Sequence, residues 1–181
     1  MNKNKEIYNI VLSSIFLGMA FVLPFLTGQI PEIGSMLCPM HIPVILCGFI
    51  CGWKYGLLVG VCSPILRSVI LGMPPMFPTA FSMCFELGTY GLISGLLYNQ
   101  LLNKFIKRRE SLIIITLIIS MLIGRGVYGS VMFILMGFGK IQYSIKMFWI
   151  GSFVETLPGI IIQILFIPFI VLIYEKYKTS R

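Results

Sequence analysis

Residues 112–138 read LIIITLIISMLIGRGVYGSVMFILMGF, an apolar run that contains one charged side chain, Arg125. A helix of about 20 apolar residues is long enough to cross the hydrocarbon core of a bilayer. Backbone groups in lipid must pair within their own segment, so a helix is the expected structure. The run therefore predicts a membrane-spanning helix with an arginine near its middle.

Five more apolar stretches precede or follow this run, at residues 7–26, 33–53, 55–71, 77–102 and 147–174. Together they predict an all-α fold, a six-transmembrane-helix bundle that forms a single domain over residues 1–181. The clean part of the second stretch is short, at residues 42–51, so a re-entrant segment is the alternative there. The first stretch has no small-residue cleavage site after it, which favours a retained helix over a signal peptide.

The composition agrees with a chain whose solvent is mostly lipid. Of its 181 residues, 57% are hydrophobic and 11% are charged, whereas a soluble domain carries about 25% charged residues. The net charge of +8 does not indicate nucleic-acid binding, because the basic residues flank the apolar runs.

The predicted inner segments hold Lys3, Lys5, Lys54, Lys104, Lys107, Arg108, Arg109, Lys176, Lys178 and Arg181. The outer segments hold only Lys140 and Lys146. By the positive-inside rule both termini are cytoplasmic, in a multi-pass protein of the cell membrane.

Four charged residues fall inside the predicted spans: Arg67, Glu86, Arg125 and Glu155. Each costs roughly 2.5–3.5 kcal/mol at the bilayer centre, so such residues face the bundle interior or mark a substrate pathway. Helical rise lets all four reach one level in the outer half to middle of the bundle. They form either ion pairs that fix helix packing or a polar pocket that binds a solute. Pro158 frees a backbone carbonyl beside Glu155, which favours a cavity.

Aromatic side chains accompany two of these charges. Tyr90 lies one turn after Glu86, and Tyr128 lies three residues after Arg125, so each shares a helix face with a charge. His41, the only histidine, lies near the outer end of the second stretch and is a further candidate contact. Because arginine binds carboxylates bidentately, an anionic solute is the better match. The Pro- and Gly-rich outer loops at residues 27–38 and 72–78 are candidates for a lid over the pocket.

The sequence lacks the motifs of an enzyme. No G-x-x-x-x-G-K-[ST], H-E-x-x-H or G-x-S-x-G occurs. The cysteines do not form a ligand set for a metal and are interpreted as small hydrophobic residues. We therefore expect no catalytic residues, no cofactor and no metal. Small residues recur four apart, as at Ser14 and Gly18, and let helices approach closely within the bundle or dock a membrane partner.

The segment at residues 38–98, CPMHIPVILCGFICGWKYGLLVGVCSPILRSVILGMPPMFPTAFSMCFELGTYGLISGLLY, resembles the substrate-binding S-components of energy-coupling factor (ECF) transporters. The number of helices, the basic inner loops and the Pro-rich outer loops extend this resemblance over the whole chain. The resemblance implies a vitamin bound in the outer half of the bundle, beneath outer loops that close over it. It also implies a separate transmembrane coupling subunit and two ATPase subunits. The family's A-x-x-x-A docking motif corresponds here to Ser14-Ile-Phe-Leu-Gly18, which contains no alanine.

The resulting hypothesis is capture of a small water-soluble vitamin from outside for ATP-driven uptake, with pantothenate as the first choice. By position, the resemblance assigns ligand contacts to Glu86, Tyr90, Arg125, Tyr128 and Glu155, to which the residue analysis adds Arg67 and His41. Two alternatives are a proton-coupled secondary carrier of a small anionic solute and a membrane scaffold whose buried charges serve packing only. The first alternative is disfavoured because no internal repeat is visible.

Overall fold

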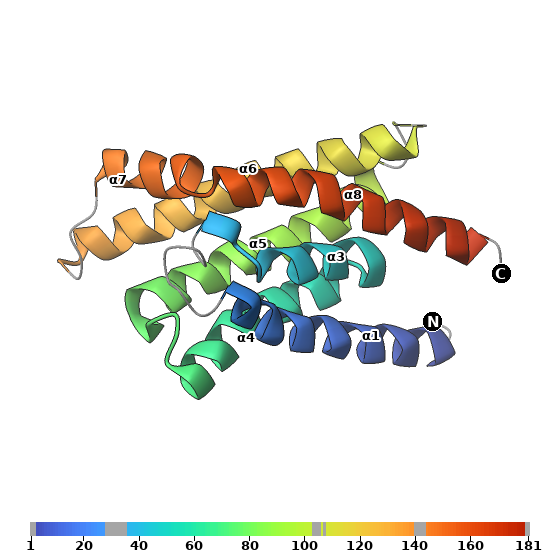
Figure 1. Ribbon diagram of the computed structural model, residues 1–181, viewed down its shortest axis with the longest axis horizontal. Coiled ribbons are helices and arrows are strands. Elements are labelled where there is room, and N and C mark those ends of the chain that lie inside the picture. Colours follow the sequence, from blue (N-terminus) through green and yellow to red (C-terminus); the bar gives the residue numbers. More distant parts are fainter. Residues whose placement is uncertain (1–2, 28–35, 103–105, 107, 140–143, 180–181) are drawn as a thin grey trace.

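The computed structural model describes residues 3–27, 36–102, 106, 108–139 and 144–179, and every regular element in this part of the chain is helical. The helices, labelled as in Figure 1, are α1 (Lys3–Val22), α3 (His41–Cys51), α4 (Trp53–Leu71), α5 (Phe81–Leu96), α6 (Arg109–Gly137), α7 (Ile145–Trp149) and α8 (Leu157–Thr179). Four shorter helical turns extend α1, both ends of α5, and α7, at Leu23–Thr27, Met76–Ala80, Leu97–Leu101 and Ile150–Val154. Most of the outer loop predicted as a lid, residues 28–35, lies outside the described residues, as do Lys104, Lys107, Lys140 and Arg181.

Among the described residues, five helical segments are long and apolar enough to cross a membrane. They run over residues 3–25, 53–71, 76–100, 109–137 and 157–177 and correspond to five of the six predicted stretches. The second stretch contributes only α3, which has 11 residues and spans roughly 16 Å at 1.5 Å per residue. The prediction of an all-helical membrane protein is thus confirmed, and the second crossing stays a prediction.

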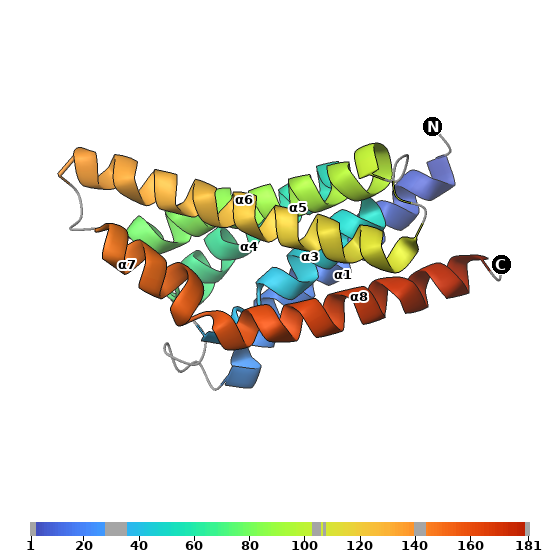
Figure 2. The same ribbon diagram turned by 90° about the horizontal axis from the view of Figure 1, so that it is seen from above.

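The short helix α3 lies in the middle of the bundle. It packs against α1, α4, α5 and α8, and α5 in turn packs against α4 and α6 (Figures 1 and 2). Fully buried apolar side chains of α3, α5 and α6 form the core, including Ile45, Leu87 and Ile113. Both chain ends lie at one end of the molecule and α7 lies at the other (Figure 1). The end that holds the two termini and the region around α7 are therefore opposite poles of the bundle.

Glycines bring α3, α4 and α5 into backbone contact. A Cβ added to Gly91 on α5 would lie 2.1 Å from the carbonyl oxygen of Gly56 on α4. A Cβ on Gly48 of α3 would lie 2.5 Å from the Gly91 oxygen, and one on Gly60 would lie 2.3 Å from the Leu87 oxygen. No side chain fits at these distances, so the four-residue spacing of small residues serves close packing inside the bundle.

The sixth predicted stretch, residues 147–174, is not one continuous helix. Glu155 and Thr156 form a turn between a π-helical turn at Ile150–Val154 and the start of α8, where the Glu155 N–H donates to the Ile150 carbonyl and the Thr156 carbonyl accepts the Ile160 N–H. Pro158 explains the break, because it has no N–H to donate to the carbonyl four residues earlier and its ring clashes with that carbonyl. Figure 2 shows α7 and this turn running at an angle to α8.

Candidate functional site

Two charged side chains meet inside the bundle, one from α5 and one from α6. Arg125 Nη1 lies 2.9 Å from Glu86 Oε1, and the two residues are 7% and 2% exposed. Isolated charges at this depth are too costly to persist, whereas a hydrogen-bonded pair offsets much of the cost. The contact joins the middle of α6 to the first turns of α5.

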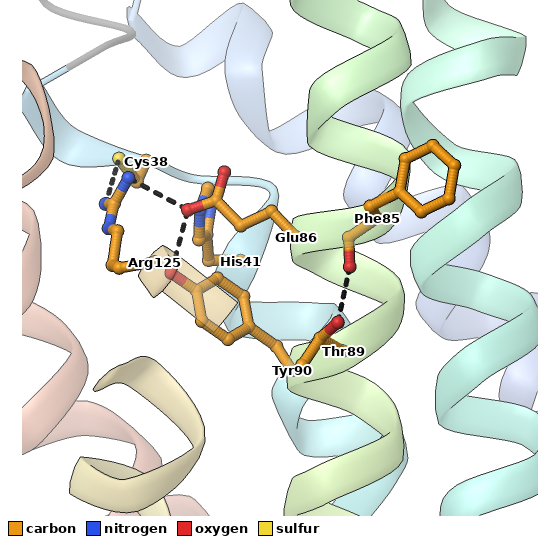
Figure 3. A network of polar contacts seen from close by, with 7 residues as sticks. All are labelled: Cys38, His41, Phe85, Glu86, Thr89, Tyr90 and Arg125. Carbon is orange, nitrogen blue, oxygen red and sulfur yellow. Dashed lines mark hydrogen bonds and ion pairs between the residues drawn. The ribbon is translucent and has the colours of Figure 1, made fainter. Parts of the chain in front are cut away.

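The same carboxylate oxygen is the centre of a larger network (Figure 3). The Tyr90 hydroxyl donates a hydrogen bond to Glu86 Oε1 at 2.8 Å. His41 Nε2 lies 3.7 Å from that oxygen, and the His41 ring packs on Tyr90 with ring centroids 5.2 Å apart. Arg125 Nη2 faces the Cys38 sulfur at 3.7 Å. Residues from α3, α5, α6 and the turn before α3 therefore converge on one point, and we call Cys38, His41, Glu86, Tyr90 and Arg125 the polar cluster.

Several nitrogen atoms of the polar cluster make no hydrogen bond to the described residues. Arg125 Nε and both ring nitrogens of His41 are buried and make no hydrogen bond there. A buried polar group without a partner costs about 1–3 kcal/mol, so each such atom needs an explanation. Three such nitrogen atoms therefore lie within one cluster.

Local sequence features position these side chains. Glu86 and Tyr90 are four residues apart on α5 and so lie one above the other on its buried face. Gly124 makes room for the tyrosine, because a Cβ there would lie 2.2 Å from Tyr90 Cε1. Cys38 has a φ of +47°, uncommon for a residue with a side chain, and its carbonyl accepts the His41 N–H at 3.0 Å at the start of α3.

Arg67 makes different contacts from those expected. Its Nη1 donates to the backbone carbonyl of Phe21 at 2.9 Å, and its guanidinium lies 5.4 Å from the centre of the Phe25 ring. Arg67 thus ties α4 to the end of α1 and to the turn that follows α1. The sequence offered no signal for this, because a carbonyl acceptor is not visible in residue types.

Glu155 and Tyr128 differ in their burial. Glu155 is exposed at the break before α8, so the interpretation of it as a buried charge is wrong. A continuous sixth helix was assumed in estimating its depth, and the break at Pro158 removes that basis. Tyr128 is half-buried on α6, three residues beyond Arg125.

Two residues of the site were not singled out from the sequence. Cys38 was grouped with the apolar cysteines, yet its sulfur faces Arg125. Gly124 makes room for the Tyr90 ring, and its residue type alone gives no sign of this contact. The CPMH sequence at residues 38–41 places a thiol and an imidazole three residues apart, which was the available signal.

A second polar network lies at the end of the molecule where the termini are. The Tyr98 hydroxyl donates to Glu175 Oε1, and Arg109 Nη1 contacts the same oxygen. These residues come from the turn after α5, from the start of α6 and from α8. The network therefore ties three helix ends together at the pole opposite α7.

Fold and site together define an all-helical, multi-pass membrane protein with a charged polar cluster enclosed among its helices. A family model described as "ECF transporter, substrate-specific component" matches residues 8–171. The chain belongs to this family, which confirms the resemblance seen in the sequence. Members are substrate-binding subunits of transporters that associate with a membrane ECF module of transmembrane and ATPase subunits. Searches of curated proteins and of solved structures gave no match.

Proposed function

We propose that this protein captures a small water-soluble vitamin at the outer side of the cell membrane and delivers it for ATP-driven uptake. The observation that carries the proposal is the buried pair of Glu86 and Arg125, with His41 and Tyr90 beside it and with Arg125 Nε and His41 Nδ1 making no hydrogen bond to the described residues. A pair that served packing alone gives no reason for these buried nitrogen atoms to lack hydrogen bonds. The ligand contacts are His41, Glu86, Tyr90 and Arg125, with Tyr128 as a flanking aromatic side chain.

The substrate we propose first is pantothenate. Its carboxylate matches the guanidinium of Arg125, and its hydroxyl and amide groups match the imidazole of His41 and the carboxylate of Glu86. Aromatic and apolar side chains around a few polar groups are what a site for a small solute requires. Other acidic vitamins share the carboxylate and are the next candidates.

The topology we propose has six crossings with both termini in the cytoplasm of the cell. The second crossing consists of α3 together with the chain before it. The position of both chain ends at one pole of the bundle supports an even number of crossings (Figure 1). Lys3 and Lys176 lie at that pole, in agreement with the positive-inside rule. The α7 region then faces outward.

The proposed partners are a transmembrane coupling subunit and two ATPase subunits, since the chain has no phosphate-binding loop of its own. Ser14 and Gly18 on α1 are the proposed docking residues. Both are exposed, and a Cβ on Gly18 would meet no atom within 4 Å. A small-residue face of this kind lets a partner helix approach closely.

Mass spectrometry of small molecules released from the purified protein tests the proposal. The wild-type protein is expected to release one vitamin in about equimolar amount, and the double variant Glu86→Gln/Arg125→Met is expected to release none. The double variant is the matched control because it removes both charges together and leaves no unpaired charge in the bundle. A folded wild-type protein that carries no small molecule and binds none would support the scaffold alternative instead.

Uptake measurements separate the proposed mechanism from a proton-coupled carrier. Uptake into cells is expected to stop when the ATPase partners are absent and to persist when a protonophore is added at constant ATP. The opposite pattern would contradict ATP-driven import and would make Glu86 the candidate proton site.

A further inference from the structure

The guanidinium of Arg125 contacts a carboxylate on one side only. Its Nη1 lies 2.9 Å from the carboxylate oxygen Oε1 of Glu86 and forms an ion pair with it. Its Nη2 faces the sulfur of Cys38 at 3.7 Å, and its Nε has no partner among the described residues. Nε and Nη2 share one edge of the planar group, and on that edge their two N–H bonds point in the same direction. This edge of the buried arginine therefore contacts a sulfur through Nη2, and its Nε makes no hydrogen bond to any described residue.

A thiol is a poor occupant of this edge. Sulfur is a weak acceptor, and a single sulfur atom leaves Nε unsatisfied. A carboxylate has two oxygens at the spacing of the two N–H groups and accepts from both. A ligand carboxylate in the position of the Cys38 thiol would accept from both nitrogens of the edge and leave the ion pair with Glu86 in place.

The Cys38 side chain can leave Arg125 while the turn that carries it stays in place. The turn packs on α8, because a Cβ added to Gly159 would lie 2.5 Å from the Met36 carbonyl oxygen. The Cys38 carbonyl also accepts the His41 N–H at 3.0 Å. Rotation about the Cα–Cβ bond of Cys38 moves the sulfur away from Arg125 and breaks the N–H···S contact, which is weak.

We propose that the substrate's carboxylate binds the Nε–Nη2 edge of Arg125 and takes the place of the Cys38 thiol. The inference rests on the proposed function and adds to it the group that is recognised and the atoms that recognise it. Arg125 then lies between two carboxylates, one from Glu86 and one from the substrate. His41 Nε2, 3.7 Å from Glu86 Oε1, belongs to the adjacent imidazole, whose ring nitrogens can donate or accept a hydrogen bond. A singly charged planar group fits this arrangement better than a dianion does.

Matched pairs of ligands test the proposal on the purified full-length protein. The probes are pantothenate with panthenol, biotin with biotin amide, and nicotinate with nicotinamide, with binding measured by calorimetry. Within each pair only the carboxylate changes. For whichever pair binds, the acid is expected to bind at least about tenfold more tightly than its neutral analogue, as a charged hydrogen-bonded contact implies. Equal affinities for acid and analogue would overturn the inference and leave the proposed function standing. Binding of none of the six would overturn both.

Two variants locate the contact. Arg125→Lys keeps a positive charge beside Glu86 but lacks the two-pronged edge, so the preference for the acid is expected to fall to about threefold or less. Cys38→Ala is expected to bind the acid as tightly as wild type or more tightly, because the thiol is displaced in the bound state. Loss of binding in a Cys38→Ala protein with an unchanged melting temperature would show that the thiol itself contacts the ligand, and would refute the proposal.

Discussion

Replacing Glu86 by glutamine removes one charge from the buried pair and changes little else. Glutamine has nearly the same shape, and its amide oxygen can still accept the hydroxyl of Tyr90, which now donates at 2.8 Å. What is lost is the negative charge 2.9 Å from Arg125 Nη1. The arginine remains in the bundle, 7% exposed, without a counter-charge among the described residues.

The expected cost follows from this geometry. Breaking a buried ion pair by removing one partner costs about 3–5 kcal/mol, because the other charge is left unpaired. For a protein of this size, 1 kcal/mol corresponds to a shift of about 2–4 °C in melting temperature. We therefore expect Glu86→Gln to lower the apparent melting temperature in detergent by roughly 6–20 °C.

A double-mutant cycle with Arg125→Met measures the interaction free energy between Glu86 and Arg125 separately from their other contacts. Thermal unfolding of the four proteins is followed by fluorescence-detected size exclusion at one heating rate. The double variant leaves no unpaired charge, so it is expected to be less destabilised than the sum of the single variants by about 2 kcal/mol or more. Strictly additive effects, or a Glu86→Gln protein that melts within about 1 °C of wild type, would refute the assignment of a charge-compensated pair.

Three further substitutions probe packing and the site. Gly124→Ala is expected to displace the Tyr90 ring, lowering stability by about 1–3 kcal/mol and weakening ligand binding measured by calorimetry; unchanged binding would remove Tyr90 from the site. Gly91→Ala is expected to force two helices apart and lower the melting temperature, while the matched control Gly18→Ala changes stability by about 0.5 kcal/mol or less; equal melting temperatures would contradict the close backbone packing. Arg67→Met is expected to cost about 1.5–3 kcal/mol through its lost bond to a carbonyl of α1, with ligand affinity within about twofold of wild type; a collapse of affinity would instead make Arg67 a ligand contact.

The fold could be predicted where a single physical constraint dominates. Apolar length alone identified residues 112–138 as a span, and α6 covers that run. It was insufficient at the second stretch, where α3 has only 11 residues. It also failed at residues 147–174, because hydropathy carries no information about the hydrogen bond that Pro158 cannot make. Hydropathy therefore locates apolar segments but not the points at which a helix breaks.

The site could be predicted in part for a similar reason. The depth estimate brought four charges to one level, and of these the structure joins Glu86 and Arg125. The four-residue spacing on α5 predicted that Tyr90 lies beside Glu86. The partner of each charge depends on how far each helix is rotated about its own axis. The rise per residue gives the depth of a side chain but not this rotation. Arg67 accordingly contacts a backbone carbonyl of α1 rather than a carboxylate.

The most direct test of the central claim is a structure of the wild-type protein determined with its co-purified small molecule. The account predicts that this molecule lies within hydrogen-bonding distance of the Arg125 guanidinium and beside His41, with the Cys38 sulfur moved away from Arg125. A bound molecule elsewhere in the bundle, with the Glu86–Arg125 pair and the Cys38 contact unchanged, would contradict it.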